Sequence, residues 1–313
     1  MTARHSPFAT TLPLSPFPGS LFGDPPPSPG YLYFESLGSG SSGNCSILYH
    51  AGEALILDAG IGIRTFKKRA LTLLGSDVKP VGILVTHDHG DHVRGLLPLA
   101  RFLSVPVFGS PEVCRALRSR TRHDRYGLPG VSLRVIEAEE LFSVGSFRVK
   151  AFEVPHDAVR NFGYTVTVPS GAFSLITDVG KVTQRIRAAI RESNFLVLES
   201  NFDEGMLLRG SYTQALKARI LGGEGHLSNA LAGETVAEEM HPGLGFVALC
   251  HLSGNNNTPA LALESFIQRL AESGITASLL TEETAEPDTS EDATILSVTA
   301  LGRNVVSPLF RLG

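Results

Sequence analysis

The chain has few cysteines and no long apolar run, and each shortage excludes a class of protein. Its 313 residues include only three cysteines, Cys45, Cys114 and Cys250, which are scattered along the chain. An odd, scattered set does not form the disulfide framework of a small secreted domain. No apolar run approaches the ~20 residues that a membrane-spanning helix needs. The sequence therefore predicts a protein without membrane association, and we expect a cytoplasmic location.

The first thirty residues lack any candidate helix or strand, because prolines interrupt all of them. They also lack the charged segment followed by an apolar one that marks a secretory signal. We expect residues 1–30 to form a disordered, proline-rich tail and residues 31–313 to form one domain, which is long enough to bury a core without disulfides. A second polar stretch, Glu282 to Asp292, is expected to be a surface loop before a last strand-like piece, Ala293 to Phe310.

In the remainder of the chain, short apolar runs alternate with segments of helical periodicity, which is typical of an α/β fold. Apolar runs at residues 81–85, 147–154, 173–177 and 245–250 are predicted strands. The predicted helices are Ile61 to Leu74, Val93 to Leu103, Val182 to Arg191 and Pro259 to Glu272.

Residues 87–92 read His-x-His-x-Asp-His and lie between a predicted strand and a predicted helix. A loop that leaves a strand can direct alternate side chains into one pocket. Imidazole and carboxylate groups are ligands of zinc, iron or manganese, whereas structural zinc sites are rich in thiolates. A polar surface turn is the alternative, but four metal-binding side chains in this register favour a metal site.

Three further strands each deliver a histidine or aspartate at their carboxyl ends, where α/β proteins place their sites. These residues are His156, Asp178 and His251. Taken singly, each is more simply explained as an exposed turn residue. Together with the motif at residues 87–92, they predict one shared site.

These residues resemble the five motifs of the metallo-β-lactamase superfamily, in order, over roughly residues 31 to 281. The first motif corresponds to Asp58, and the others to residues 87–92, His156, Asp178 and His251. The resemblance implies a four-layer αβ/βα sandwich that binds two divalent metal ions per chain, zinc or manganese. It assigns one ion to His87, His89 and His156, and the other to Asp91, His92 and His251, with Asp178 bridging. Asp58 would orient a ligand, although a helix N-cap before Ile61 explains it nearly as well.

The segment between Asp178 and His251 is similar to the phosphodiesterase branch of that superfamily. There, a glutamate on a strand partners a histidine that protonates the leaving oxygen, and these roles correspond to Glu199 and His226. Asp91, Glu199 and His226 are thus the expected catalytic residues. For His226 alone, an exposed loop position near the start of a helix is the alternative.

Six short motifs further resemble the YycJ/WalJ group of bacterial proteins, which are described as 5′→3′ exonucleases acting on DNA. The motifs include Gly38 to Cys45, Val154 to Ala158, Gly225 to Asn229 and the pair Asn255-Asn256. The chain departs from the group at Phe202, where histidine is usual. The apolar phenyl ring can neither accept nor donate a proton, so this position has lost any polar role, while the predicted metal ligands are intact.

The loop from Gly38 to Asn44 is rich in glycine and serine, and glycine allows successive backbone amides to converge on an anion. A flexible hairpin connection explains the loop equally well. We expect Ser41, Ser42 and Asn44, with Asn255 and Asn256, to contact substrate. A serine nucleophile is not expected, because metal-bound hydroxide supplies that function.

The net charge is −4, and nonspecific DNA affinity is mainly electrostatic, so any DNA-binding surface has to be local. Arginines cluster after residue 111, and Lys67-Lys68-Arg69 forms a second basic group. The cluster consists of Arg115, Arg118, Arg120, Arg122 and Arg125. Arg115, Arg118 and Arg122 would share one helical face and form either a phosphate track or an ordinary solvated surface.

The sequence thus predicts a dinuclear phosphodiester hydrolase that acts on nucleic acid, as a 5′→3′ DNA exonuclease. A small-molecule hydrolase of the same fold, such as a cyclic phosphodiesterase or thioesterase, is one alternative. A catalytically silent binding protein is the other. The sequence leaves the oligomeric state open.

Overall fold

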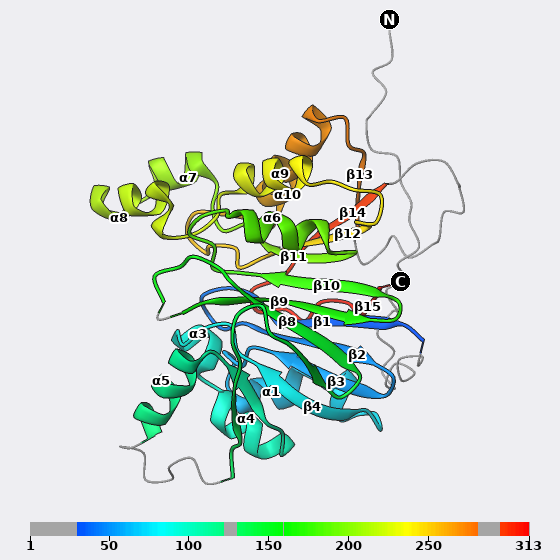
Figure 1. Ribbon diagram of the computed structural model, residues 1–313. Helices are drawn as coiled ribbons and strands as arrows, with labels where there is room; N and C mark the ends of the chain where they lie inside the picture. Colours follow the sequence, from blue (N-terminus) through cyan, green and yellow to red (C-terminus); the bar gives the residue numbers. More distant parts are fainter. Residues whose placement is uncertain (1–29, 122–129, 159, 281–294, 313) are drawn as a thin grey trace, which may run out of the picture.

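The computed structural model describes residues 30–121, 130–158, 160–280 and 295–312. The predicted tail, the acidic stretch at residues 282–292, and Arg122 and Arg125 lie outside these ranges. The described residues form two β-sheets that face each other, with helices on the outer face of each (Figure 1).

The first sheet is antiparallel from β15 to β3 and parallel from β3 to β6. Its strands, in spatial order, are β15 (Phe310–Leu312), β1 (Leu32–Gly38), β2 (Cys45–His50), β3 (Glu53–Leu57), β4 (Lys79–Leu84), β5 (Val107–Gly109) and β6 (Leu133–Val135). Chain-terminal strand β15 pairs with β1, so the two ends of the described chain meet in one sheet.

The second sheet is parallel from β13 to β10 and antiparallel from β10 to β7. Its strands, in spatial order, are β13 (Ala277–Leu279), β14 (Leu296–Ala300), β12 (Phe246–Cys250), β11 (Phe195–Glu199), β10 (Gly171–Ile176), β9 (Phe162–Val168), β8 (Phe147–Glu153) and β7 (Leu141–Val144). The predicted single strand from Ala293 to Phe310 was wrong, because β14 and β15 belong to different sheets.

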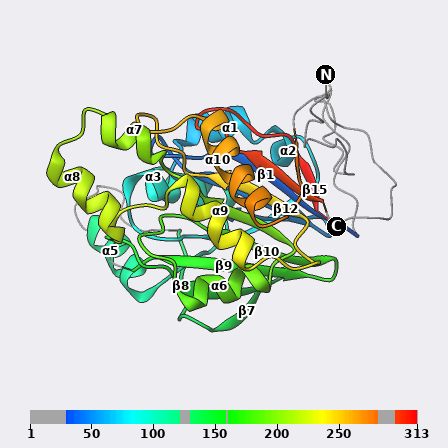
Figure 2. The same ribbon diagram turned by 90° about the horizontal axis from the view of Figure 1, so that it is seen from above.

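Helices cover the outer faces of both sheets (Figures 1 and 2). Those that follow strands of the first sheet are α1 (Ile63–Arg69), α2 (Leu71–Leu74), α3 (Gly90–Val93), α4 (Leu96–Leu103) and α5 (Pro111–Thr121). Those that follow strands of the second sheet are α6 (Gln184–Arg191), α7 (Glu204–Arg209), α8 (Gln214–Arg219), the π-helix η1 (Ile220–Glu224), α9 (Asn229–Glu238) and α10 (Pro259–Glu272).

Three apolar clusters correspond to the three interfaces between these layers. One, which includes Phe34 and Phe173, lies between the two sheets. A second packs the first sheet against its helices, and the third packs the second sheet against α6, α9 and α10. This is the four-layer sandwich that the sequence predicted. Cys250 belongs to the inter-sheet cluster, as expected of a core residue.

Two predicted helices are each broken into two. Ile61 to Leu74 divides at Ala70, whose backbone leaves the helical conformation (φ −78°, ψ 52°). Val93 to Leu103 divides where Gly95 comes so close to the loop after β3 that a Cβ there would lie 1.9 Å from the Ile61 carbonyl oxygen. The second break depends on a tertiary contact that periodicity does not reveal. Within the described ranges, no helix combines the length and apolarity needed to cross a membrane.

Candidate metal centre

The loops that follow β3, β4, β8, β10, β11 and β12 meet at one edge of the sandwich and carry the predicted site residues. Three of those residues have a left-handed backbone conformation: Asp58 (φ 59°), Asp178 (φ 56°) and His251 (φ 53°). Residues other than glycine rarely adopt it, and the strain is typical of functional sites. Each strand therefore ends in a sharp turn that directs one polar side chain along the sheet edge.

The loop that contains residues 87–92 is held against the loops before β2 and after β3 by close backbone contacts. The Asn44 amide donates to the Asp91 carbonyl oxygen (2.7 Å), and the Ala59 amide donates to that of His92 (2.8 Å). A Cβ on Gly60 would lie 1.5 Å from the Asp91 carbonyl oxygen, so only glycine permits this approach.

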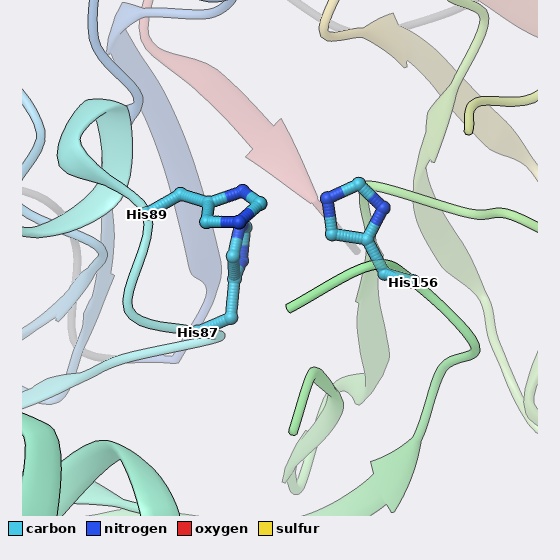
Figure 3. Close-up of side chains that lie close together, drawn as sticks. All are labelled: His87, His89 and His156. Atoms are coloured by element: carbon cyan, nitrogen blue, oxygen red, sulfur yellow. The ribbon is translucent and has the colours of Figure 1, made fainter. Parts of the chain in front are cut away.

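His87, His89 and His156 form the first of the clusters predicted to bind metal (Figure 3). One ring nitrogen from each lies within 4.8 Å of the others. Nδ1 of His87 contacts Thr86 Oγ1 at 3.0 Å, whereas the buried Nε2 has no hydrogen-bond partner among the described residues. A buried nitrogen without a partner is costly unless a ligand binds it, and imidazole binds zinc and manganese. These residues therefore fit a bound metal ion.

Asp91, His92 and His251 form a second such cluster. Asp91 Oδ2 lies 3.6 Å from His92 Nε2 and 3.3 Å from His251 Nε2. Asp178 lies between the two clusters: its Oδ2 is 3.2 Å from His92 Nε2, and its Oδ1 is 3.6 Å from His156 Nε2. Asp178 thus reaches a histidine of each cluster, which is the geometry that a bridging ligand requires.

Asp58 positions His92 and does not cap a helix. Its Oδ2 accepts from His92 Nδ1 at 2.7 Å, and its Oδ1 accepts from the backbone amide of Thr86 at 2.9 Å. The following helix begins after Gly62, with no side-chain cap. The bond to Asp58 leaves Nε2 of His92 directed toward Asp178, as an outer carboxylate does for a metal-binding histidine.

Burial and neighbouring charges control the protonation of this cluster. Burial and the nearby His92 hold the pKa of His87 well below its ordinary value. Burial would raise the pKa of Asp178, but His251 and His92 outweigh it and keep that pKa well below the ordinary value. His87 and Asp178 thus favour the neutral imidazole and the ionised carboxylate, which are the forms that bind metal, whereas nearby carboxylates raise the pKa of His92 and of His251.

Glu199 and His226 form a hydrogen-bonded pair beside the clusters, with Glu199 Oε1 2.8 Å from His226 Nδ1. Burial would lower the pKa of His226, but Glu199 and Asp178 outweigh it and raise that pKa. The reading of His226 as an ordinary exposed loop residue was wrong, and Ser228 is the residue that caps α9. Because Glu199 occupies Nδ1, Nε2 is the nitrogen left to transfer a proton.

Glu199 has more partners than the sequence indicated. This fully buried carboxylate also accepts from the backbone amides of Val179 (2.6 Å) and Leu227 (3.1 Å). Its Oε1 lies 3.0 Å from Nδ1 of His251. It therefore connects the proposed proton donor to a metal-binding histidine and to two loops.

The glycine- and serine-rich loop is only partly available to an anion. The amides of Ser39, Gly40, Gly43 and Asn44 already donate to acceptors within the protein. Only the amides of Ser41 and Ser42, at the exposed tip, lack an acceptor among the described residues. Only the two amides at the tip are therefore free to donate to an anion, and binding of substrate by this loop stays a prediction.

The other predicted substrate contacts have different surroundings. The Asn44 side chain is buried, accepts from the Gly40 amide, and lies 2.9 Å from His92 Nε2. Asn255 is exposed and donates to the Tyr212 hydroxyl at 3.3 Å. Asn256 is buried and lines a pocket beside His226, together with Ser41 and Phe202. Phe202 belongs to none of the metal-type clusters.

Two residues whose roles the sequence did not reveal support the site. Asn201 donates to the His251 carbonyl oxygen at 2.6 Å, which stabilises the strained turn there. Asn257 is buried and donates to the carbonyl oxygens of Ser200 and Asn201, both at 2.9 Å. Its place in the run Asn255-Asn256-Asn257 was the available signal, but sequence alone could not tell which of the three asparagines are buried.

Arg115 and Arg118 of the predicted basic cluster are exposed on α5. The side chain of Arg120 and all of Arg122 and Arg125 lie outside the described residues. The shared face is therefore described only for the first two arginines.

The chain is similar in sequence to known nucleases. The family described as "Beta-lactamase superfamily domain" matches residues 54–243. Exodeoxyribonuclease YycJ of Bacillus anthracis is 34% identical over 78% of this chain and 90% of its own length. Exodeoxyribonuclease WalJ of Streptococcus pneumoniae serotype 2 is 30% identical over 79% of this chain and 90% of its own length.

Solved structures show the same fold at low sequence identity. The metallo-β-lactamase fold protein YhfI from Bacillus subtilis superimposes with a TM-score of 0.61 and 14% identity. The match covers 88% of this chain and 99% of that protein.

Proposed function

We propose that this chain, which belongs to the β-lactamase superfamily and within it to the family of the exodeoxyribonucleases YycJ and WalJ, removes nucleotides from DNA in the 5′→3′ direction. Family membership makes it a metal-dependent hydrolase. The observation that carries the proposal is the Glu199–His226 pair, which adjoins histidine and carboxylate clusters suited to metal binding. A metal centre with an adjacent proton donor can cleave an ester whose leaving group is a poor one, such as the sugar oxygen of DNA.

We infer that two divalent ions, zinc or manganese, bind at the centre. Their proposed ligands are His87, His89 and His156 for one ion, Asp91, His92 and His251 for the other, and Asp178 for both. Such a pair, when bound, supplies water of lowered pKa and offsets the negative charge that grows on the phosphate oxygens.

The residues of the chain then move two protons. The oxygen of water adds to phosphorus while the bond from phosphorus to the sugar O3′ breaks. Asp91, the most exposed of the proposed carboxylate ligands at 19%, accepts the proton from water. His226 donates the proton on Nε2 to O3′ and is then recharged from solvent, since its side chain is 27% exposed.

A cytoplasmic location and a single domain over residues 31–313 belong to the same proposal. The first sheet pairs β15 with β1, from opposite ends of the described chain, and one apolar cluster joins the two sheets, which supports one domain.

A substrate panel tests the proposal. The metal-loaded protein should release mononucleotides from DNA labelled at the 5′ end before it releases label from the 3′ end. RNA, bis-p-nitrophenyl phosphate and a thioester serve as the other substrates. Thioester hydrolysis without DNA cleavage would support the small-molecule alternative, and inactivity on all four would support the silent binding protein.

A further inference from the structure

A pocket of about 220 Å³ lies beside His226, and the proposed reaction does not yet use it. Residues of α7, α8 and the π-helix form one side, and the loops after β11 and β12 form the other. Figure 1 shows α7 and α8 projecting beyond the layer of helices over the second sheet. The ion pair between Arg219 of α8 and Asp157 connects this projection to the neighbour of the metal-type ligand His156.

The lining of this pocket matches the chemistry of a nucleoside. Phe202 and Leu207 are buried apolar walls, and Tyr212 is a half-buried aromatic ring. Asn201 and Asn256 add amide groups. Aromatic rings stack on nucleobases of any sequence, and amides can hydrogen-bond their edges.

The position of the proton donor selects which nucleoside enters. His226 has to lie within hydrogen-bond reach of the leaving O3′, so the leaving nucleoside lies on the His226 side of the scissile phosphate. Both Gly225 and His226 line the pocket. The space on that side is therefore available to the leaving group.

We propose that this pocket binds the base and sugar of the terminal nucleotide that is released, with Tyr212 stacking on the base. This inference rests on the proposed function, because it takes the released nucleotide as the leaving group. A pocket for one terminal nucleotide would also explain digestion from an end.

Terminal abasic DNA tests the proposal. Release of the first residue from DNA with an abasic 5′-terminal nucleotide should be roughly 10-fold slower in kcat/KM than from normal DNA, the range of one base–aromatic stack. Tyr212→Ala should cause a similar loss on normal DNA and little further loss on the abasic substrate, because both changes remove one contact. Tyr212→Phe should retain activity, and Leu208→Ala, an exposed change on α7 outside the pocket lining, is the matched control.

Equal rates on normal and terminally abasic DNA, with efficient digestion of both, would overturn the pocket assignment and leave the nuclease proposal intact. If DNA is not digested at all, the proposed function fails, and calorimetry then tests the pocket directly. Binding of thymidine 5′-monophosphate should be about tenfold tighter than that of deoxyribose 5-phosphate to the metal-loaded protein. Equal affinities would exclude a base-binding pocket.

Three arginines from distant parts of the chain lie at the loop of residues 38–44. Arg69 Nη1 donates to the Leu37 carbonyl oxygen at 2.7 Å, and Arg94 Nη1 donates to that of Ser42 at 3.4 Å. The Arg303 side chain packs on Gly40 of the loop, because a Cβ there would lie 3.2 Å from its Cγ and 3.3 Å from its Nε.

None of these three arginines forms an ion pair with a described carboxylate, whereas Arg160 and Arg187 each pair with glutamates. Nε of Arg303 is buried without a hydrogen-bond partner among the described residues. The loop that the arginines surround also carries Asn44, which contacts His92. Uncompensated positive charge therefore adjoins the metal centre.

We infer that Arg94 and Arg303 bind phosphates of the DNA strand at this loop. Binding of a phosphorothioate oligonucleotide, measured over a series of salt concentrations, tests the idea. The double variant Arg94→Gln/Arg303→Gln should lower the slope of log affinity against log salt by about one unit per lost contact. Arg64→Gln, an exposed change on α1, should leave the slope unchanged. An unaltered slope in the double variant with normal metal content would overturn the inference.

Discussion

In the interior of the site, His92 and Asp178 are almost completely buried, and each lies within hydrogen-bonding distance of partners from distant segments. At the rim, Ser41, Ser42 and Asn255 are exposed, and the structure gives them few partners. Several contacts thus fix the position of each side chain in the interior, whereas the side chains at the rim have few such contacts. Changes in the interior should therefore affect metal binding, chemistry and folding together, whereas changes at the rim should affect substrate binding alone.

The largest expected effect is that of Asp178→Ala, which removes the carboxylate between the two clusters. DNA cleavage should fall by roughly 10³-fold or more, because several kcal/mol of transition-state stabilisation depend on the metals. Metal analysis should find fewer than two ions per chain. Asp77→Ala, at an exposed position, is the control. Two ions retained in Asp178→Ala would refute the bridging role.

His226→Ala should come next and should separate proton transfer from metal binding. Cleavage of DNA should fall by roughly 10²–10⁴-fold, because the sugar oxygen has to be protonated. Hydrolysis of bis-p-nitrophenyl phosphate should fall much less, since p-nitrophenolate is a better leaving group. Metal content should be unchanged, and His241→Ala serves as a histidine control. A similar loss on both substrates would contradict the assignment.

Glu199→Gln tests whether a residue of the interior has effects beyond catalysis. The amide of glutamine has one acceptor oxygen where the carboxylate has two. The substitution therefore also weakens the hydrogen bonds to Val179, Leu227 and His251. We expect a milder loss of DNA cleavage than in His226→Ala and a loss of about 1–3 kcal/mol in the free energy of unfolding. Denaturant unfolding of the metal-loaded protein measures it. Unchanged stability would show that Glu199 acts on His226 alone.

The smallest effect is expected for the exposed arginines of α5. Arg115→Gln/Arg118→Gln should weaken DNA binding and reduce its salt dependence only if α5 contacts phosphates, by about one unit of slope per contact. Turnover of bis-p-nitrophenyl phosphate should be unchanged. Comparison with the Arg94→Gln/Arg303→Gln variant shows which surface carries the DNA. Equal losses on both substrates would mean that the α5 arginines support folding instead.

Much of the interior could be predicted from sequence because its chemistry is local. Residues 87–92 contain four metal-binding side chains shortly after β4, β10 ends two residues before Asp178, and β12 ends immediately before His251. Strand ends are recognisable where an apolar run stops, and parallel strands place their carboxyl ends at one edge. The fold class followed from the same alternation of elements.

The predictions that failed, and the details that the sequence left open, depended on contacts between distant segments. Helical periodicity could not show that Gly95 would approach Ile61, and the choice between helix cap and histidine partner for Asp58 required the position of His92. The inward turn of Asn257 and the multiple contacts of Glu199 are of the same kind.

The amino-acid sequence determines the types of ligand, their order and the strands that carry them, because hydrophobic pattern and side-chain chemistry are local properties. The distances that turn those ligands into clusters, and the pocket and arginines around them, arise only when the two sheets pack together. Packing brings residues such as Arg94 and Arg303 to one loop, although more than 200 residues separate them in the chain. No local sequence pattern predicts that these two residues lie at the same loop, since their positions depend on the packing of the strands between them.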